Sequence, residues 1–441
     1  YEICLSDWSS DVCSSDLIQP WMALLGHTLN SRVWQEKSVI EIVEDVFADH
    51  SSIAAWKWDD DVTAYVAGGL FARNGGQRAY CVQYRETDLA FVQRLLAEEG
   101  ICWRVEEDES APGGHTVVFF VSSAQQAQDA ISASSLGGAG IRFHGSSSQE
   151  VQDSIQALGS VRQVGPTGTV LQGWDYKAHA AITAEVPTAH DWGGDEATSL
   201  QSWLTSYDPT GDFVFGNQAE AQFAATRLQE AHEARYKTWL GRGTVRTLRA
   251  GTWFAVTQST LDPLSAFGLA DEDKQFFVTG CDLIGINNLP KELSDKIAKS
   301  LGAADLPALA ATGPDTFAVD STALYQRAAQ TGYACQFQAL RRNVPWRAVL
   351  MDDTGLRPRP RPTALGPQTA IVVGPDGNVN ASGADELYTD QLGRIKVKFH
   401  WQANAFAPQR ANSDHSCWLR VMQRLAGPGM GHQFIPRIGH E

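Results

Sequence analysis

A succession of short strand patterns separated by turn residues is the feature that most constrains the fold of this chain. From residue 122 to about residue 345, short alternating apolar and polar runs are separated by glycine and proline, which is typical of β-barrels and β-sandwiches. A helix interrupts the pattern at 218–240, and the alanine-rich stretch 289–330, helical above all at 291–301, is interpreted as an insertion. The expected strands are 142–145, 160–164, 170–178, 243–248, 253–256 and 276–284.

Helices and strands alternate in the preceding part of the chain, residues 18–121. Ser38 precedes apolar residues spaced three and four apart, which predicts an amphipathic helix with Ser38 as its N-cap. A second helix is predicted from an N-cap at Thr87 to a stop at Gly100. The strands expected around it are 80–84, 101–105 and 115–121.

The clearest domain boundary is a proline-rich run, GLRPRPRPTALGP, at residues 355–367. Proline fixes φ and lacks a backbone donor, so this run is predicted to be an extended linker. The chain is thus expected to comprise a mixed portion at 18–121, a β-barrel portion at 122–354, the linker, and a small all-β module at 368–441. The strands expected in the module are 368–373, 387–390, 393–401, 417–423 and 431–436.

Both ends of the sequence are unusual. Residues 1–17, YEICLSDWSSDVCSSDL, carry acidic residues and no basic one, lack the features of a secretory signal, and resemble a translated sequencing adapter. We expect them to be a non-native leader. The other end, GHQFIPRIGHE, stops within a strand pattern, so the sequence is expected to be an internal part of a longer protein.

Composition argues against two broad classes of protein. The 51 acidic residues outnumber the 35 basic ones, for a formal net charge of −16, and such a surface repels nucleic-acid phosphates and anionic lipid. No apolar run approaches the ~20 residues of a membrane helix, so stable membrane insertion is not expected. The seven cysteines form no CxxC pair, which indicates isolated reduced thiols, although Cys81 and Cys102 are expected on neighbouring strands and could face each other.

No catalytic, cofactor-binding or metal-binding residues are predicted. The Walker pattern is absent, the glycine cluster at 137–140 lacks the third glycine of a dinucleotide motif, and GSSS at 145–148 has no following glycine to complete a nucleophile elbow. His232 and Glu233 resemble part of a zinc-protease helix, but Tyr236 occupies the position of the second histidine. His232 is therefore expected at a surface or an interface.

Three charged or histidine-bearing segments are also interpreted as structural. The run Asp-Asp-Asp at 59–61 is expected in a solvated turn, and His179 and His190 are too loosely spaced to be named as metal ligands. Strand 394–398, Arg-Ile-Lys-Val-Lys, places its basic residues on one face and its apolar residues on the other. A half-buried strand with a solvated basic face is favoured over nucleic-acid binding, because no aromatic stacking platform accompanies it.

Four stretches, in order along the chain, carry a family resemblance. They are WMALL and NSRVWQEKS within 21–38, YCVQYRETD continuing to EGI within 80–101, GPQTAIVVG at 366–374, and YTDQLGRIKVKFHW at 388–401 with its continuation at 417–421 and 434–439. This set resembles the VgrG family, the trimeric tip proteins of the type VI secretion system. The resemblance runs from Ile18 to Glu441 and weakens across 289–330.

The resemblance implies a mainly β, phage-tail-like spike with α/β elements. Residues 18–367 would be a hub of two β-barrels, and 368–441 the start of an OB-fold β-barrel. The implied partners are two further copies in a homotrimer, a hexameric tube protein, a PAAR-repeat cap, and effector proteins with their adaptors. Such a protein is assembled in the bacterial cytoplasm and driven into a target cell by sheath contraction, so its action is mechanical and not enzymatic.

Three alternatives stay open from the sequence. The chain could be the hub or spike protein of a contractile phage tail or a related injection particle, which shares the same architecture. It could belong to a spike that carries an effector enzyme beyond residue 441. The third alternative is a nucleic-acid-binding OB module, against which the acidic composition argues.

Overall fold

The fold comes from a computed structural model, in which the chain divides into two compact units. Unit 1 combines Tyr1–Leu24, Ser52–Val62 and Leu96–Pro358, and unit 2 combines Leu25–Ser51, Thr63–Leu95 and Arg359–Glu441. The residues that the structure describes are 19–134, 140–144, 152–190, 203–212, 214–258, 271–285, 291–301, 321–348, 363–381, 383, 386–402 and 417–441. The leader at 1–17 and most of the proline-rich linker lie outside them.

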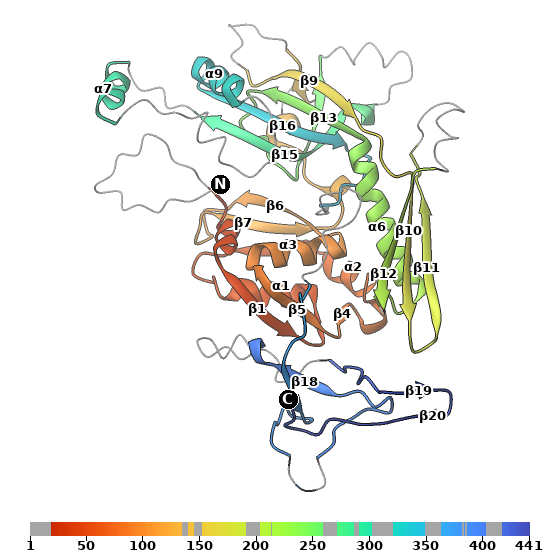
Figure 1. The fold of residues 1–441 in the computed structure, drawn as a ribbon. Helices are drawn as coiled ribbons and strands as arrows, with labels where there is room; N and C mark the ends of the chain where they lie inside the picture. Colours follow the sequence, from red (N-terminus) through yellow and green to blue (C-terminus); the bar gives the residue numbers. More distant parts are fainter. Residues whose placement is uncertain are drawn as a thin grey trace. The chain divides into compact units, whose positions relative to one another are not determined.

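Unit 2 contains an antiparallel strand pair that brings two of the sequence motifs side by side. Strand β1 (Leu29–Trp34) pairs with β5 (Cys81–Thr87), and helix α1 (Val39–Ala48) follows β1 in the chain (Figure 1). Trp34 stacks on Phe91 of helix α3 (Asp88–Glu99), with ring centroids 5.0 Å apart. The shorter elements in this stretch of sequence are η1 (Trp21–His27), β2 (Lys37–Ser38), α2 (Val62–Ala67), η2 (Ala72–Asn74) and β4 (Gln77–Arg78).

Local sequence signals set the ends of α1 and α3 as predicted. Ser38 Oγ accepts the N–H of Glu41 at 3.3 Å, and the Glu41 carboxylate accepts the N–H of Ser38 at 2.7 Å, which forms a capping box. Thr87 Oγ1 accepts the N–H of Ala90 at 3.2 Å. Gly100, with a φ of 75°, ends α3 in the left-handed region that glycine adopts without strain.

The first sheet of unit 1 has three strands in the order β3-β7-β6. Strand β3 (Trp56–Trp58) runs parallel to β7 (His115–Phe120), and β6 (Cys102–Glu107) runs antiparallel to it. Trp58 stacks on Phe119 with ring centroids 4.3 Å apart. The predicted strands at 101–105 and 115–121 are confirmed within two residues at their ends.

A six-stranded sheet contains the main core of unit 1. Phe254, Phe276 and Phe337 are buried there, and Phe254 lies 5.5 Å from Phe276 and 5.3 Å from Phe337 between ring centroids. Gly241 allows this packing, because a Cβ at that position would lie 2.1 Å from the Phe337 ring. In spatial order the strands are β8 (Ile141–Arg142), β14 (Trp253–Thr257), β15 (Gln275–Gly285), β16 (Tyr333–Arg341), β13 (Lys237–Gly243) and β9 (Ile155–Arg162).

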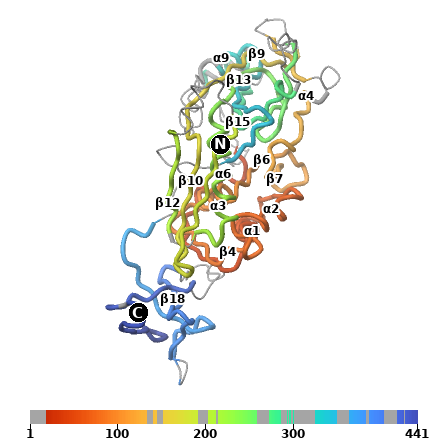
Figure 2. The backbone as a smooth tube through the Cα atoms, turned by 90° about the vertical axis from the view of Figure 1, so that its right-hand side faces the viewer, coloured from red at the N-terminus to blue at the C-terminus, as the bar shows by residue number. Residues whose placement is uncertain are grey.

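The third sheet of unit 1 has one face covered by a long helix. Its order is β11-β10-β12, with bounds Ala180–Pro187, Gly168–Asp175 and Thr205–Asp212. Helix α6 (Gln218–Tyr236) packs on β10 and β11 and lies along β10 in both views (Figure 1 and Figure 2). Thr169 Oγ1, pointing from β10, donates to the buried Gln229 Oε1 of α6 at 2.9 Å.

Two sequence predictions in unit 1 are wrong at the end of α6. The helix was expected to continue to residue 240, but 237–243 is β13, because it pairs on both sides with β9 and β16. The expected strand at 243–248 is absent. Val245 and Leu248 are loop residues whose side chains are buried in the core of unit 1. The apolar pattern that suggested a strand therefore comes from a loop packed against the core. The predictions also missed β11, β12 and β16.

The insertion at 289–330 is helical at 291–301 as predicted, in α7 (Lys291–Leu301). A second helix, α9 (Ser321–Thr331), precedes β16, and its Leu324 and Ala328 pack against Ala334. None of the helices in the described ranges is long and apolar enough to span a bilayer.

The C-terminal part of unit 2 is a small β module. Strands β17 (Ala370–Val373) and β18 (Lys396–Phe399) pair antiparallel, and β19 (Ala426–Gly427) and β20 (Met430–Gly431) form a hairpin. The expected strand at 387–390 is absent, because the Asp390 carboxylate accepts the N–H groups of Leu392 and Arg394 and forms a turn. The expected strand at 417–423 is reduced to a bridge at Leu419, and that at 431–436 starts at Met430 and ends at Gly431.

Candidate functional site

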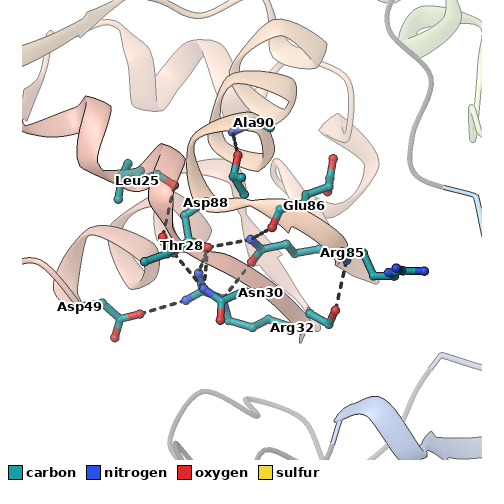
Figure 3. Close-up of polar contacts among 12 residues, drawn as sticks. Leu25, Thr28, Asn30, Arg32, Asp49, Arg85, Glu86, Asp88 and Ala90 are labelled. Carbon is teal, nitrogen blue, oxygen red and sulfur yellow. Dashed lines mark hydrogen bonds and ion pairs between the residues drawn. The ribbon is translucent and has the colours of Figure 1, made fainter. Parts of the chain in front are cut away.

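A buried polar cluster joins β1, β5 and the first turn of α3. We call this cluster the β1–β5 junction; it consists of Thr28, Asn30, Arg32, Asp49, Gln83 and Asp88 (Figure 3). Asp88 is its centre and is only 1% exposed. Its carboxylate accepts Thr28 Oγ1 at 2.9 Å, Asn30 Nδ2 at 2.9 Å and Gln83 Nε2 at 2.7 Å, and it forms an ion pair with Arg32.

Arg32 links the junction to the following helix. Its Nε donates to Gln83 Oε1 at 2.9 Å, and its Nη1 lies 3.1 Å from Asp49 Oδ2, next to the C-terminus of α1. Arg32 is 5% exposed, so its charge is removed from water and balanced by the two carboxylates. One guanidinium thus connects β1, β5, α1 and α3.

The electrostatics of the junction favour an ionised Asp88. Burial alone would raise the pKa of this carboxyl, but the Arg32 charge and the hydrogen bonds from Gln83, Asn30 and Thr28 outweigh burial and hold the pKa below its usual value. Because all these donors serve the charged form, Asp88 is an acceptor and not a proton donor near neutral pH.

A second, largely buried ion pair joins helix α3 to strand β5. Arg94 of α3 contacts both carboxylate oxygens of Glu86, at 2.9 and 2.8 Å, and also donates to the Val82 carbonyl at 3.1 Å. The bidentate geometry is the strong form of this interaction. The motif QYRETD at 83–88 is therefore used mainly to attach α3 to β5.

A β-bulge at Arg85 separates the two halves of the strand pair. The register shifts between Asn30 and Ser31, and Arg85 adopts a φ of 51°, with its N–H donating to Ser31 Oγ at 3.1 Å. Arg85 is exposed and points away from the junction (Figure 3). The bulge keeps Gln83 and Asp88 on the buried side of the pair.

The exposed side of β5 contacts the C-terminal module within unit 2. Tyr84 Oη donates to Gln368 Oε1 at 3.4 Å, and the Tyr84 and Trp401 rings meet edge to face with centroids 5.3 Å apart. Trp401 in turn stacks on Phe399 at 5.3 Å. The second and fourth sequence motifs are therefore packed together.

The geometry of the junction supports mechanical attachment more than turnover. The Asp88 carboxylate accepts bonds from several partly or fully buried donors, so it is not free to move a proton. The sequence did not identify this cluster. The available signal was the presence of Asn30, Arg32 and Gln83 within strands of otherwise alternating pattern. Which side chains these residues bond to depends on the register of β1 with β5, including the bulge.

His232 is placed differently from the expectation. It is 2% exposed near the C-terminal end of α6, and its Nε2 has no hydrogen-bond partner. Burial, with a smaller contribution from Arg235, lowers the pKa of His232 to about 4. The expectation of a surface histidine is thus wrong for this chain considered alone, because α6 buries it as a neutral side chain.

The other segments noted in the sequence lie apart. Asp60 and Asp61 are exposed in a turn as expected, while Asp59 lies 3.8 Å from Arg104. His179 is exposed, and His190 contacts the ring of Tyr236. Across the described ranges, no group of three or more His, Cys, Asp or Glu could hold a metal ion. Residues 137–139 and 145–148 lie outside those ranges.

The basic strand has the two faces that its alternation predicts. Ile395 and Val397 are buried with Val372, while Lys396 and Lys398 are partly exposed. Arg394 forms an ion pair with Asp390.

Among the described residues, five cysteines are present as thiols and not as disulfides: Cys81, Cys102, Cys281, Cys335 and Cys417. The prediction that Cys81 and Cys102 lie on neighbouring strands is wrong, since β5 pairs with β1 and β6 pairs with β7.

Comparison with known families gives two matches in sequence order. Residues 17–289 match the phage tail baseplate hub (GPD) model, and residues 383–441 match the type VI secretion system/phage-baseplate injector OB domain model. Both parts of the predicted fold class, hub-like and OB-fold, are confirmed.

Individual relatives extend the comparison over nearly the whole chain. The type VI secretion system spike protein VgrG1b of Pseudomonas aeruginosa is 27% identical over 96% of this chain and 46% of its own length. The actin cross-linking toxin VgrG1 of Vibrio cholerae is 27% identical over 93% of this chain and 30% of its own length. The predicted resemblance to VgrG proteins is confirmed. The chain spans about half the length of the first relatives it matches.

Among solved structures, the E. coli c3393 protein is described as a component of the type VI secretion system with structural similarity to T4 bacteriophage tail proteins gp27 and gp5. It matches with a TM-score of 0.43 and 14% identity, over 85% of this chain and 64% of that chain.

Proposed function

Because this chain belongs to the phage tail baseplate hub (GPD) family, we propose that it forms the hub and the first part of the OB-fold in a type VI secretion spike. The observation that carries this proposal is the order of the two matches: a hub at 17–289 followed by an injector OB domain at 383–441 in one chain. The similarity to spike proteins extends over 96% of this chain, at 27% identity. This similarity favours a role in the secretion machine over a role in a phage tail.

The proposed action is mechanical. Three copies form a platform on the hexameric tube, a PAAR-repeat protein caps the tip, and effectors with their adaptors are carried on the spike. The protein assembles in the cytoplasm and leaves the cell when the sheath contracts. Buried ion pairs such as Arg32–Asp88 and Arg94–Glu86 suit this role, because they join strands and a helix into a unit that resists deformation.

The proposed organisation keeps residues 18–121 and 122–354 as hub portions, 355–367 as a linker, and 368–441 as OB-fold. No enzymatic step is assigned to these residues, and no catalytic, cofactor or metal residues are proposed. The saturated carboxylates of the β1–β5 junction support this view.

The proposal is tested by deleting the gene in its source bacterium and measuring the tube protein released into the medium. Deletion is expected to abolish release, and a plasmid copy of the full-length gene is expected to restore it. A copy with the exposed Lys57→Ala change serves as a matched control and is expected to restore release fully. Unchanged tube release after deletion would contradict the proposal.

A second candidate function is the hub of a contractile phage tail, because both family descriptions name phage baseplates. In that case deletion would leave tube release unchanged and abolish the infectivity of induced phage particles. The similarity to a toxin of which this chain covers only 30% supports a further proposal, that the spike carries a fused effector domain. Sequencing the gene beyond codon 441 distinguishes a needle alone from a needle with an enzyme.

A further inference from the structure

Three cationic side chains lie in a row across the end of the six-stranded sheet. Lys237 of β13 pairs with Arg162 of β9. On the other side of β13, the register with β16 continues to place Lys237 beside Arg341. All three share the face that carries the core, because Trp239, two residues from Lys237, is buried there and side chains alternate along a strand. We call Arg162, Lys237 and Arg341 the basic row.

Aromatic rings support two of these cations. Lys237 Nζ lies 5.0 Å and Arg341 Cζ lies 4.6 Å from the centroid of the Trp239 ring. Arg341 Cζ also lies 4.5 Å from the centroid of the Phe276 ring. The faces of aromatic rings attract a positive charge, so they hold both side chains at the border of the core. Packing on these rings, and not pairing with a carboxylate, therefore keeps the two charges in place.

The basic row lacks the anions that would balance it. Among the described residues, none of its three side chains has a hydrogen-bond or ion-pair partner, and the buried Arg341 Nη1 is unpaired. Burial, together with the charges of Arg162 and Arg341, lowers the pKa of Lys237. Asp273 is the acidic residue whose charge acts on both Lys237 and Arg341, so three cations are set against one carboxylate. A bound anion would offset their mutual repulsion.

Strand β9 leaves a backbone edge open next to the basic row. It is the last strand in the sheet order, and the edge beyond β13 is bridged at Ile155. The Gln163 N–H donates to the Tyr236 carbonyl at 2.9 Å. Because antiparallel strands alternate between bonded and non-bonded pairs, this bond directs the backbone groups of Arg162 away from β13. Residues 159–164 are exposed, so an extended segment can reach this edge.

We propose that the open edge of β9 and the basic row together bind an extended acidic segment of a partner protein. The segment adds to the sheet as a further strand beside β9, where backbone hydrogen bonds supply affinity. Its residue opposite Arg162 lies on the same face as the basic row, so a carboxylate there meets Arg162 and Lys237 and selects for acidic segments. The inference goes beyond the proposed function and does not depend on it.

The test measures, by fluorescence anisotropy, the binding of a dye-labelled peptide of alternating Glu and Val to the full chain. Arg162→Gln and Lys237→Gln are each expected to raise the dissociation constant about threefold to tenfold, and added salt should weaken the wild-type complex. Arg242→Gln is the matched control: it removes a charge from the other face of β13 and should bind as the wild type does. Absence of saturable binding to the wild type, or equal binding by all three variants, would overturn the inference.

Two further probes separate an acidic segment from other ligands. A peptide with Gln in place of every Glu keeps the backbone groups but no charge, and is expected to bind about tenfold more weakly or worse. Inorganic phosphate should displace the Glu peptide no better than chloride does at the same ionic strength. Equal binding of the Gln peptide, or specific displacement by phosphate, would reject the assignment to an acidic segment.

Hydrogen exchange locates the bound peptide without relying on the folding of any variant. Amide exchange within 156–164 of the full chain is expected to slow when the Glu peptide binds, because the open edge of β9 gains hydrogen-bond partners. Binding without protection of this segment would overturn the inference. Protection that instead rises with the concentration of the chain alone would also overturn it, since a second copy would then occupy the edge.

Discussion

At Asp88, a single carboxylate holds the β1–β5 junction together, because Thr28, Asn30, Gln83 and Arg32 all contact it. Asp88→Asn removes the charge and turns an amide N–H₂ towards these donors. We expect the free energy of unfolding to fall by about 3 to 5 kcal/mol, as when one partner of a buried ion pair is lost. Urea denaturation monitored by circular dichroism measures this change.

The matched control for this change is Asp49→Asn. Asp49 contacts the same guanidinium but its side chain is 22% exposed, and Arg32 keeps its bond to Asp88 in the variant. The expected loss is about 1 kcal/mol or less. Equal losses at Asp49 and Asp88 would contradict the central role of Asp88.

At His232, burial makes the stability of unit 1 depend on pH. The pKa of His232 is lowered to about 4, against ~6.5 in an unfolded chain, so the unfolded state binds the proton more readily. Stability is therefore complete above pH ~6.5 and falls as the pH drops towards 4, by about 3 kcal/mol at most. His232→Gln, which stays neutral, is expected to remove this loss in urea denaturation at pH 7 and pH 4.5.

The corresponding control is His27→Gln, since His27 is exposed. Asp88 acts in a different window: its pKa is lowered, so its contribution is present above the unfolded value of ~3.9 and is lost only as the pH falls below it. A His232→Gln variant with unchanged loss between pH 7 and 4.5 would contradict the assignment.

Residues such as Arg32 and Asp88 show what the sequence could not supply. Both lie within motifs that were recognised, but their pairing depends on the register of β1 with β5, including the bulge at Arg85. A shift by one residue would turn Arg32 to the other face of the pair. His232 was misplaced for a related reason, since the periodicity of α6 does not reveal that this histidine is buried in the folded chain.

At the scale of elements, the N-cap of α3 gives a direct prediction. Thr87 Oγ1 accepts the N–H of Ala90 at 3.2 Å, next to the Asp88 that the junction holds. Thr87→Ala is expected to lower the free energy of unfolding by about 1 kcal/mol, while Thr87→Ser, which keeps the hydroxyl, should lose only a small part of that. If Ser and Ala behave alike in urea denaturation, the cap does not contribute.

Elements with local end signals were predicted well, and elements defined by distant pairing were not. Helices α1 and α3 begin at Ser38 and Thr87 as expected, because a cap acts within one helical turn. The sequence predicts helix across β13, because Trp239 and Leu240 continue the apolar spacing of α6. Pairing with β9 and β16 overrides that local pattern.

At the scale of the whole molecule, the chain has two units with separate cores, one around Phe254 and Phe276 and one around Val372 and Val397. Calorimetry of the full chain is therefore expected to show more than one unfolding transition. Phe254→Leu, in the core of unit 1, should destabilise that unit by about 1 to 3 kcal/mol and lower only its transition temperature. Asp88→Asn should lower only the transition of unit 2. One cooperative transition that both variants shift equally would show that the units unfold together.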